Sequence, residues 1–317
     1  MHGKRPDYDE AYELFSILVS EDDARIAAYL TSMEVIGYTP EMVAGFAAAM
    51  RDNSVKLRLG SVADTAGTGG DHSNTINVST AASLILSSFT GVAKHGNRSV
   101  TSRSGSADIL EKMGIDPLLK PADALSLYRK TGFTFLYAPL YHPSLKNIMQ
   151  IRKKLGFRTI FNLLGPLSNP AAPTQQMIGV SSLEMLDVIA HALPYLGVKR
   201  ALVVYGNGID EVNPQGPTEI AEIEGHDIRK YALDPRDIGL ERSGIKVCKG
   251  PDESAKRVMD VFAGGGSIED KNFIVLNAAV ALYAADICDL PECPAEVVEI
   301  LGEPMLEHME EIKCFFQ

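Results

Sequence analysis

The stretch D-T-A-G-T-G-G-D-H-S-N-T-I-N-V-S-T, residues 64–80, decides how we interpret the fold. Its glycine run, Gly67-Thr68-Gly69-Gly70-Asp71, lets the backbone turn tightly and approach a ligand without Cβ clashes. The polar residues at its end open an apolar stretch that we predict to be a helix, Ala81–Phe89. Successive N–H groups of such a loop bind anions, as does the N-terminus of the following helix. We therefore predict a phosphate cradle, although a plain Gly-rich turn before a capped helix would have the same pattern.

Two common nucleotide motifs do not fit this stretch. No Gly-Lys-Ser/Thr follows the glycines, as a Walker A loop would require. The third glycine of G-x-G-x-x-G is replaced by His72, which excludes the dinucleotide fingerprint.

The sequence changes character near Ser61. Residues 8–53 show only helical patterns, and Thr39-Pro40-Glu41 marks one helix start. Beyond residue 61, predicted strands alternate with predicted helices, which is typical of a mostly parallel sheet covered by helices. The strands are expected at 92–94, 134–137 and 201–205, and the helices at 107–113, 122–130 and 183–196.

A second interruption of the alternation runs from about Pro143 to Pro173. It contains a basic helix, Leu145–Leu155, and the loop Leu164–Pro170, and we expect it to pack on the N-terminal helices. The predicted fold class is α/β, with a small all-helical domain made of two chain segments and a large α/β domain with a mostly parallel central sheet. The expected bounds are 1–60 joined by about 143–173 for the helical domain, and 61–142 with 174–317 for the α/β domain.

Composition limits the kind of partner. The 317 residues carry a net charge of −11, whereas a nucleic-acid binder needs a basic excess to neutralise phosphates. No stretch approaches the roughly 20 apolar residues of a membrane span. The first residues have no apolar core after their charges, so we expect no signal peptide and a cytoplasmic protein. The cysteines at 248, 288, 293 and 314 are expected to be ordinary thiols, because the spacing of 288 and 293 fits neither a zinc knuckle nor a CxxC motif.

Two further loops carry candidate ligand-binding groups. K-H-G-N-R-S-V-T-S, residues 94–102, follows a strand predicted at Thr90–Ala93 and combines cations with hydrogen-bonding side chains. Ligands of open α/β sheets bind at the carboxyl ends of strands, where this loop is expected. G-N-G-I-D-E, residues 206–211, ends on two adjacent carboxylates, which together with substrate phosphates can bind Mg²⁺. Solvated surface charges and a capped turn are the alternatives for these two loops.

Five motifs in this order resemble the anthranilate phosphoribosyltransferase family of tryptophan biosynthesis over nearly the whole chain: GTGGD, NVST, KHGNRSVTS, RKKLGFRTIFNLLGPLSNP and GIDE. Members join 5-phosphoribosyl 1-diphosphate (PRPP) to the amine of anthranilate and release diphosphate. The resemblance implies PRPP contacts at Gly67, Gly70, Asp71, Thr75, Asn77, Val78, Ser79, Thr80, Lys94, His95, Gly96, Asn97, Arg98, Ser99, Val100, Thr101, Ser102 and Ser106. It implies anthranilate contacts at Gly67, Asn97 and Arg152, magnesium ligands at Ser79, Asp210 and Glu211, two Mg²⁺ ions bound with PRPP, and a homodimer through the helical domain.

The chemistry of the reaction fits the absence of a catalytic triad. An aniline-type amine is neutral at physiological pH and needs no deprotonation before attack, so we expect positioning and electrostatics to dominate. Lys94, His95 and Arg152 would position the substrates, and His95 and His142 would shape the aromatic site without acting as strong bases. The chain departs from the family pattern at Ser144, where Ala is common, and at Ser254, where Asn is common. We expect neither departure to touch an assigned residue.

Three other functions remain open from the sequence. The first is an enzyme like the pyrimidine-nucleoside phosphorylases, whose usual K-S-T-G-G loop is absent here. The second is a phosphoribosyltransferase for another aromatic amine. The third is a non-catalytic relative that binds nucleic acid, which the net charge of −11 disfavours.

Overall fold

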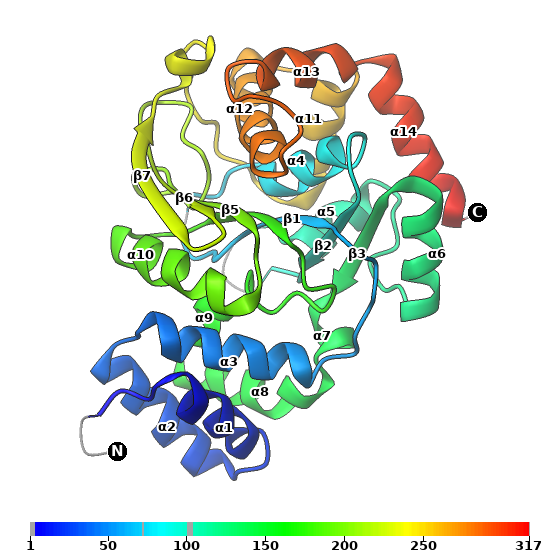
Figure 1. Ribbon diagram of the computed structural model, residues 1–317. Helices are drawn as coiled ribbons and strands as arrows, with labels where there is room; N and C mark the ends of the chain where they lie inside the picture. The colour runs from blue at the N-terminus through cyan, green and yellow to red at the C-terminus, as the bar shows by residue number, and fades with distance from the viewer. Residues whose placement is uncertain (1–3, 72, 100–103, 317) are drawn as a thin grey trace.

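The computed structural model describes residues 4–71, 73–99 and 104–316. A helical layer lies beneath a larger α/β part (Figure 1). The N-terminal segment forms α1 (Tyr8–Leu18), α2 (Asp23–Ile36) and α3 (Pro40–Asp52) before any strand, as predicted. Thr39 caps α3, since its hydroxyl accepts the Met42 N–H at 3.2 Å, and Pro40 occupies the first turn.

Within the described residues, the central sheet has seven strands in the order β3-β2-β1-β4-β5-β6-β7. The five strands from β3 to β5 are parallel, which confirms the predicted fold class, and β6 and β7 return antiparallel at one edge. The sequence did not predict these two edge strands, because charged residues interrupt their apolar pattern. The strands are β1 (Ala63–Gly67), β2 (Val92–Gly96), β3 (Phe133–Tyr137), β4 (Gln175–Gly179), β5 (Arg200–Tyr205), β6 (Thr218–Glu224) and β7 (Asp227–Leu233).

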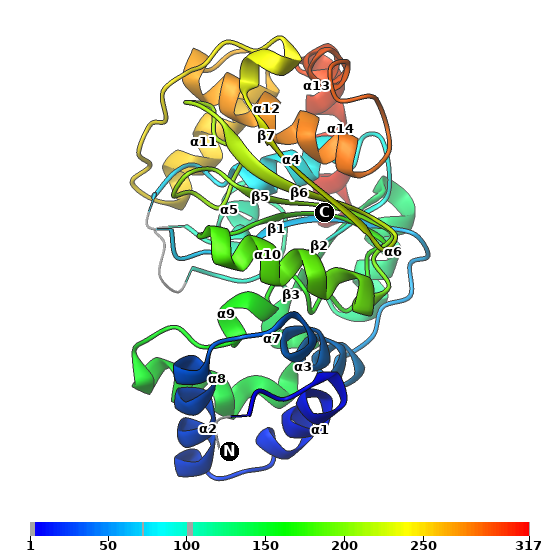
Figure 2. The ribbon, with the colours of Figure 1, turned by 60° about the vertical axis from the view of Figure 1, so that its left-hand side comes forward.

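Helices cover both faces of the sheet (Figure 2). On one face α4 packs against β1, β2 and α12, and α11 packs against α5; on the other face α10 packs against β5 and α3. The predicted helices are present with shifted ends: α4 begins at Val78, three residues before the predicted start, and α10 ends at Ala192, followed by a 3₁₀ turn. The helices are α4 (Val78–Leu86), α5 (Ser106–Lys112), α6 (Pro121–Thr131), α10 (Leu183–Ala192), α11 (Pro251–Phe262), α12 (Ile268–Ala284), α13 (Cys293–Ile300) and α14 (Glu303–Lys313).

A returning segment completes the helical layer. It holds α7 (Ala138–Tyr141), α8 (Lys146–Leu155) and α9 (Phe161–Leu164); α8 packs on α2, and α9 packs on α3. Phe161 meets Phe46 edge to face, with ring centroids 6.5 Å apart. The helical domain is therefore built from two chain segments, as the predicted fold class requires. Its apolar core is continuous with α10 and one face of the sheet, so a shared core joins the two parts.

One loop prediction is wrong. The strand predicted to end at Ala93 continues to Gly96, so Lys94 and His95 belong to β2 and are 2% and 7% exposed. The reason is the pairing of β2 with β3, whose register runs from Val92 opposite Phe133 to Gly96 opposite Tyr137. The cationic side chain of Lys94 is therefore a buried group, not a loop charge.

The cysteine prediction also needs correction. Cys288 and Cys293 form a disulfide, whereas Cys248 and Cys314 are thiols as expected. The chain folds back between α12 and α13 and brings the two Cα atoms to 5.6 Å, a separation that the sequence spacing did not reveal.

None of the helices in the described part of the chain is long and apolar enough to cross a membrane.

Candidate active site

The glycine-rich loop lies where three strands end. Directly after β1, the Thr68 N–H donates to the Gly179 carbonyl at the end of β4 (2.9 Å), and the Gly69 N–H donates to Asp210 Oδ2 (2.6 Å). Asp210 follows β5, the neighbouring strand. A Cβ on Gly67 or Gly179 would collide with Asp210, so both positions depend on glycine for this close approach. The loop and the Asp210-Glu211 pair thus form one site at the carboxyl ends of the strands.

No ion pair neutralises the Asp210 and Glu211 carboxylates among the described residues. Burial, assisted by the nearby Asp71 carboxylate, raises the pKa of Asp210 to about 7. Burial and the Asp210 charge raise the pKa of Glu211 well above its usual range, although Lys94 opposes this rise. In the described part of the chain neither carboxylate forms an ion pair; each faces a backbone N–H instead, from Gly69 for Asp210 and from Ser79 for Glu211.

This donor set fits magnesium only together with other ligands. Mg²⁺ binds through one or two carboxylates and fills its octahedron with waters and substrate phosphates. Among the residues that the structure describes, no group of three or more His, Cys, Asp or Glu side chains could hold a metal ion alone. Two uncompensated carboxylates beside an anion cradle match a metal that arrives with a phosphorylated ligand.

Lys94 supplies the buried positive charge beneath the cradle. Its Nζ donates to the Thr65 carbonyl at 2.6 Å, and burial lowers the pKa of the amine. The Asp64 carboxylate beside it accepts from Asn169 Nδ2 at 2.9 Å, and burial raises the pKa of Asp64 to about 6. Lys94 therefore acts electrostatically on Asp64 and Glu211 together.

The helix that follows the cradle presents its N-terminus to the same region. Asn77 is the N-cap residue of α4, yet its side chain makes no capping hydrogen bond to the helix. Val78 and Thr80 are buried in the first turn, and the Ser79 carbonyl accepts from the Thr65 hydroxyl at 2.8 Å. Between cradle and helix, Asp71 accepts from the Ser73 N–H at 3.2 Å, and the Thr75 hydroxyl donates to the Ile76 carbonyl at 3.2 Å.

The departure at Ser254 does touch an assigned residue, so that expectation is wrong. The Asn77 N–H donates to the Ser254 hydroxyl at 3.0 Å, across 177 residues of sequence. The sequence could not show this contact, because α11, which carries Ser254, packs near α4 only in the folded chain.

The loop after β2 is tied to α5. The Arg98 guanidinium pairs with Asp108 (3.0 Å) and Glu111 (2.8 Å), so in this structure its charge is neutralised by α5. The Ser99 N–H also donates to Asp108, and the Ser106 hydroxyl donates to the Asn97 carbonyl at 3.2 Å. Val100, Thr101 and Ser102, which the resemblance assigns to PRPP, lie outside the described residues.

Two buried histidines face each other behind this loop. The rings of His95 and His142 meet edge to face with centroids 5.2 Å apart. Burial lowers the pKa of His95 to about 3 and that of His142 to about 4, so both rings are neutral at physiological pH. His95 Nδ1 lies 3.2 Å from the Gly165 carbonyl, which leaves Nε2 as the acceptor nitrogen. Neutral rings of this kind can shape an aromatic site but cannot supply positive charge.

Arg152 lies in the helical layer on α8, apart from the cradle. Its guanidinium donates to Asn162 Oδ1 at 3.0 Å and lies over the Phe161 ring, 5.4 Å from the centroid. Burial lowers its pKa to about 10, so it remains charged at neutral pH. Its other terminal nitrogen donates to Met149 Sδ at 3.0 Å, and no carboxylate pairs with the guanidinium among the residues that the structure describes. The positive charge of Arg152 is therefore not neutralised by an ion pair there.

Sequence reasoning missed two residues that support the loops. Arg158 donates to the Gly70 carbonyl and, at 3.0 Å, to the Ser181 hydroxyl, and so connects the returning segment to the cradle. Asn277 accepts from the Val212 N–H (2.9 Å) and donates to the Val212 carbonyl (3.0 Å), which fixes the chain just after Glu211. A single buried amide in the apolar run of α12 was the available signal for Asn277. Arg158 belongs to the motif RKKLGFRTIFNLLGPLSNP, but the resemblance assigned it no role.

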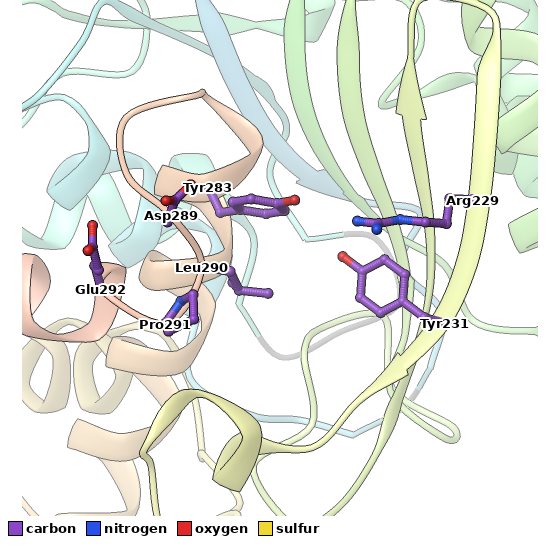
Figure 3. A pocket seen from close by; sticks show the side chains of 7 residues that line it. All are labelled: Arg229, Tyr231, Tyr283, Asp289, Leu290, Pro291 and Glu292. Carbon is purple, nitrogen blue, oxygen red and sulfur yellow. The ribbon is translucent and has the colours of Figure 1, made fainter.

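Two cavities, of about 550 and 730 Å³, lie elsewhere, between β7 and the loop from α12 to α13. There the Tyr283 ring faces Arg229 and Tyr231 across an open groove (Figure 3). Glu222, which also lines this region, is 7% exposed and paired: it accepts from Arg229 (2.7 Å) and from the Tyr283 hydroxyl (2.7 Å). The charges of Glu222, Arg200 and Arg229, unlike those of Asp210 and Glu211, are matched by protein partners.

Comparison with known proteins agrees with this geometry. Residues 59–302 match the model of the glycosyl transferase family a/b domain, and residues 1–54 match its helical bundle domain. The chain is 54% identical to the anthranilate phosphoribosyltransferase of Pyrococcus abyssi over 97% of this chain and 95% of that protein.

Solved structures give the same result. The anthranilate phosphoribosyltransferase of Thermus thermophilus superposes with a TM-score of 0.93 at 35% identity, over 99% of this chain and 97% of the other. The Saccharomyces cerevisiae enzyme, in complex with PRPP and Mg, gives 0.86 at 28% identity over 97% and 92% of the two chains. A further structure of the yeast enzyme is a complex with 4-fluoroanthranilate.

Proposed function

The chain belongs to the anthranilate phosphoribosyltransferase family, and with this family as premise we propose how its own residues transfer the phosphoribosyl group of PRPP to the amine of anthranilate. The observation that carries the proposal is the hydrogen bond from the Gly69 N–H to Asp210 Oδ2. It joins the cradle to a carboxylate pair that forms no ion pair in the described chain. A diphosphate with its magnesium supplies both the anion for the cradle and the cation for the carboxylates.

The phosphoribosyl donor lies, in this proposal, along the cradle and the start of α4. The PRPP contacts are those that the resemblance assigns from Gly67 to Thr80, from Lys94 to Ser102 and at Ser106. Asp210, Glu211 and Ser79 hold the magnesium, in two ions. When bound, Mg²⁺ stabilises the negative charge that accumulates on the leaving diphosphate.

The Arg98 side chain can contact PRPP only if it leaves its present ion-pair partners. Its guanidinium lies with Asp108 and Glu111, both partly exposed, and exchanging exposed ion pairs costs little. The backbone of the same loop, fixed by Asp108 and Ser106, can contribute donors without such a change.

The acceptor site is proposed between the two parts of the molecule. Arg152 pairs its planar donor fork with the anthranilate carboxylate, and Asn97 and Gly67 complete the contacts. His95 and His142 are neutral and form part of the aromatic wall. The amine attacks the ribose C1 as a neutral nucleophile, so positioning accounts for the rate enhancement and no side chain has to act as a strong base.

Three properties of the whole protein are also proposed, the first on the resemblance and the other two on the sequence pattern. These are a homodimer formed through the helical domain, a cytoplasmic location, and the domain bounds 1–60 with about 143–173 and 61–142 with 174–317. The packing of α8 on α2 supports those bounds. Small-molecule substrates, with neither nucleic acid nor membrane as a partner, fit the net charge of −11.

A fluorescence assay of anthranilate consumption tests the function. We expect the signal to fall only when PRPP and Mg²⁺ are both present. A parallel incubation with thymidine or uridine and phosphate tests the phosphorylase alternative. Release of the free base at an enzymatic rate, without consumption of anthranilate, would overturn the proposal.

A further inference from the structure

Asn77 lies at the N-cap of α4, a position at which an asparagine side chain normally caps the helix. An asparagine at the N-cap usually accepts, through its side-chain oxygen, the N–H of the second or third helical residue. In α4 these residues are Ser79 and Thr80, but the Asn77 side chain makes no such bond. Its Nδ2 donates instead to the Ser104 carbonyl at 3.1 Å. The side chain is therefore turned away from the helix that it would be expected to cap.

Ser254 holds Asn77 in this orientation. Its hydroxyl donates to Asn77 Oδ1 at 3.2 Å, and the Asn77 N–H donates to the same hydroxyl at 3.0 Å. Ser254 is completely buried on α11, where the Ser254 N–H is bonded to the Gly250 carbonyl. A buried hydroxyl that both donates and accepts fixes the geometry of its partner, because water cannot replace either bond there.

The consequence concerns the phosphate site at the start of α4. The oxygen that would cap the helix, Asn77 Oδ1, is occupied by Ser254. The Val78 N–H donates to the Ile76 carbonyl and the Ser79 N–H faces Glu211, so the start of α4 is directed at the carboxylate pair beside the cradle. The Thr80 N–H of the same turn has no side-chain cap, and a phosphate oxygen can bind it without first displacing one.

We propose that Ser254 is a positioning residue for PRPP binding, which keeps Asn77 from capping α4 and so leaves the Thr80 N–H of its first turn for a phosphate oxygen to bind. The inference rests on the proposed function, since it takes PRPP as the ligand of this helix. Ser254 itself makes no contact with the substrate and acts only through Asn77.

Ser254→Ala tests the proposal, because it removes the hydroxyl without adding volume. Asn77 Oδ1 then turns to the Thr80 N–H, and PRPP must displace it. Displacing a cap of typical strength corresponds to a rise of about fivefold in the KM for PRPP. We expect kcat and the KM for anthranilate to stay within about twofold of wild type. The variant also removes the acceptor of the Asn77 N–H, so the Tm without ligand should fall, and the PRPP-induced rise in Tm should become smaller.

Ser87→Ala is the matched control at the other end of α4. Ser87 is also buried, and its hydroxyl makes two hydrogen bonds, to the Leu84 carbonyl and His308. We expect this variant to lower the ligand-free Tm and to leave the KM for PRPP unchanged. An unchanged KM for PRPP in Ser254→Ala, or an equal rise of this KM in Ser87→Ala, would overturn the proposal. Turnover at saturating PRPP would continue in either case, so such a failure is distinct from a failure of the proposed function.

Discussion

Two acidic sites lie at opposite ends of β5 and differ in how their charge is balanced. Glu222, on β6, pairs across the sheet near the start of β5 with Arg200 and Arg229 and with the Tyr283 hydroxyl. Burial raises its pKa, but hydrogen bonds, chiefly those from Arg229 and Tyr283, outweigh burial, and the pKa is lowered. Asp210 and Glu211, just beyond the end of β5, have raised pKa values and no ion pair among the described residues. The charge of Glu222 is balanced by protein groups without a ligand, whereas the charges of Asp210 and Glu211 are not.

The same contrast holds for two arginines. Arg200 lies over the Tyr283 ring and pairs with Asp286 at 2.9 Å, whereas Arg152 lies over the Phe161 ring without a carboxylate partner in the described chain. The cavities lie at the balanced end of the molecule. The proposed active site is therefore marked by unmatched charge and not by cavity volume.

The largest expected effect follows from neutralising the unmatched pair. Asp210→Asn with Glu211→Gln should lower Mg²⁺-dependent turnover by about 100-fold or more, since the metal loses its protein ligands. The same change should raise the Tm of the metal-free protein, because it removes buried charge that no partner compensates. Steady-state kinetics and thermal unfolding in metal-free buffer measure both. A fall in Tm would show that the pair stabilises the fold like an ordinary ion pair.

Removing the unmatched cation should have the next largest effect. Arg152→Ala is expected to raise the KM for anthranilate roughly 10- to 100-fold, because a charged hydrogen-bonding partner of the carboxylate is lost. The KM for PRPP should change far less. Arg200→Ala is the matched control, and it should lower stability without affecting either KM. Equal increases in both KM values for Arg152→Ala would contradict the assignment.

Substitution of Glu222 should lower the stability of the fold and leave the activity unchanged. Glu222→Gln leaves Arg229 and Arg200 without their carboxylate, and the unfolding free energy should fall by about 1–2 kcal/mol, a modest value because Arg229 is largely exposed. Turnover and both KM values should match wild type. Denaturant unfolding and steady-state kinetics provide the comparison. A large loss of activity would mean that this end takes part in the reaction.

The smallest effect is a difference in pH dependence between the two ends. Asp210 has a folded-state pKa of about 7 against an ordinary 3.8, so folding favours its protonated form. Its contribution to the unfolding free energy is therefore complete below about pH 4 and is lost as the pH rises through 7. Glu222 has a lowered pKa, so its contribution is present above its ordinary value of 4.5 and is lost as pH falls through its folded-state pKa.

Unfolding in metal-free buffer from pH 4 to pH 8 separates the two contributions. The stability gained by Asp210→Asn should grow as pH rises from about 4 to 7, whereas the loss in Glu222→Gln should shrink as pH falls below 4.5. Parallel pH profiles for the two variants would remove the distinction between the ends.

The local parts of this arrangement were predictable from the sequence. The N-terminal helices, the cradle at 67–71 and the helix after it follow from caps, glycines and apolar spacing. The parallel sheet follows from the alternation of predicted elements, and the likeness of five motifs gave the family.

The remaining features depend on contacts between distant segments. Lys94 looked like a loop charge because only its pairing with β3 shows that it is inside the sheet. Arg158 reaches Gly70 across 88 residues, and Ser254 reaches Asn77 across 177. The Glu222 site joins β6, β7 and α12, and its charges look like an ordinary solvated surface when read along the chain.

The central claim is that Asp210 and Glu211 bind a metal ion that enters the site together with PRPP. Calorimetric titration of PRPP, with and without Mg²⁺, into the wild-type protein and the Asp210→Asn, Glu211→Gln variant tests it most directly, with Glu222→Gln as control. We predict that Mg²⁺ tightens PRPP binding to the wild type and to Glu222→Gln equally, and that it leaves the affinity of the double variant unchanged. The same Mg²⁺-dependent gain in the double variant would contradict the account.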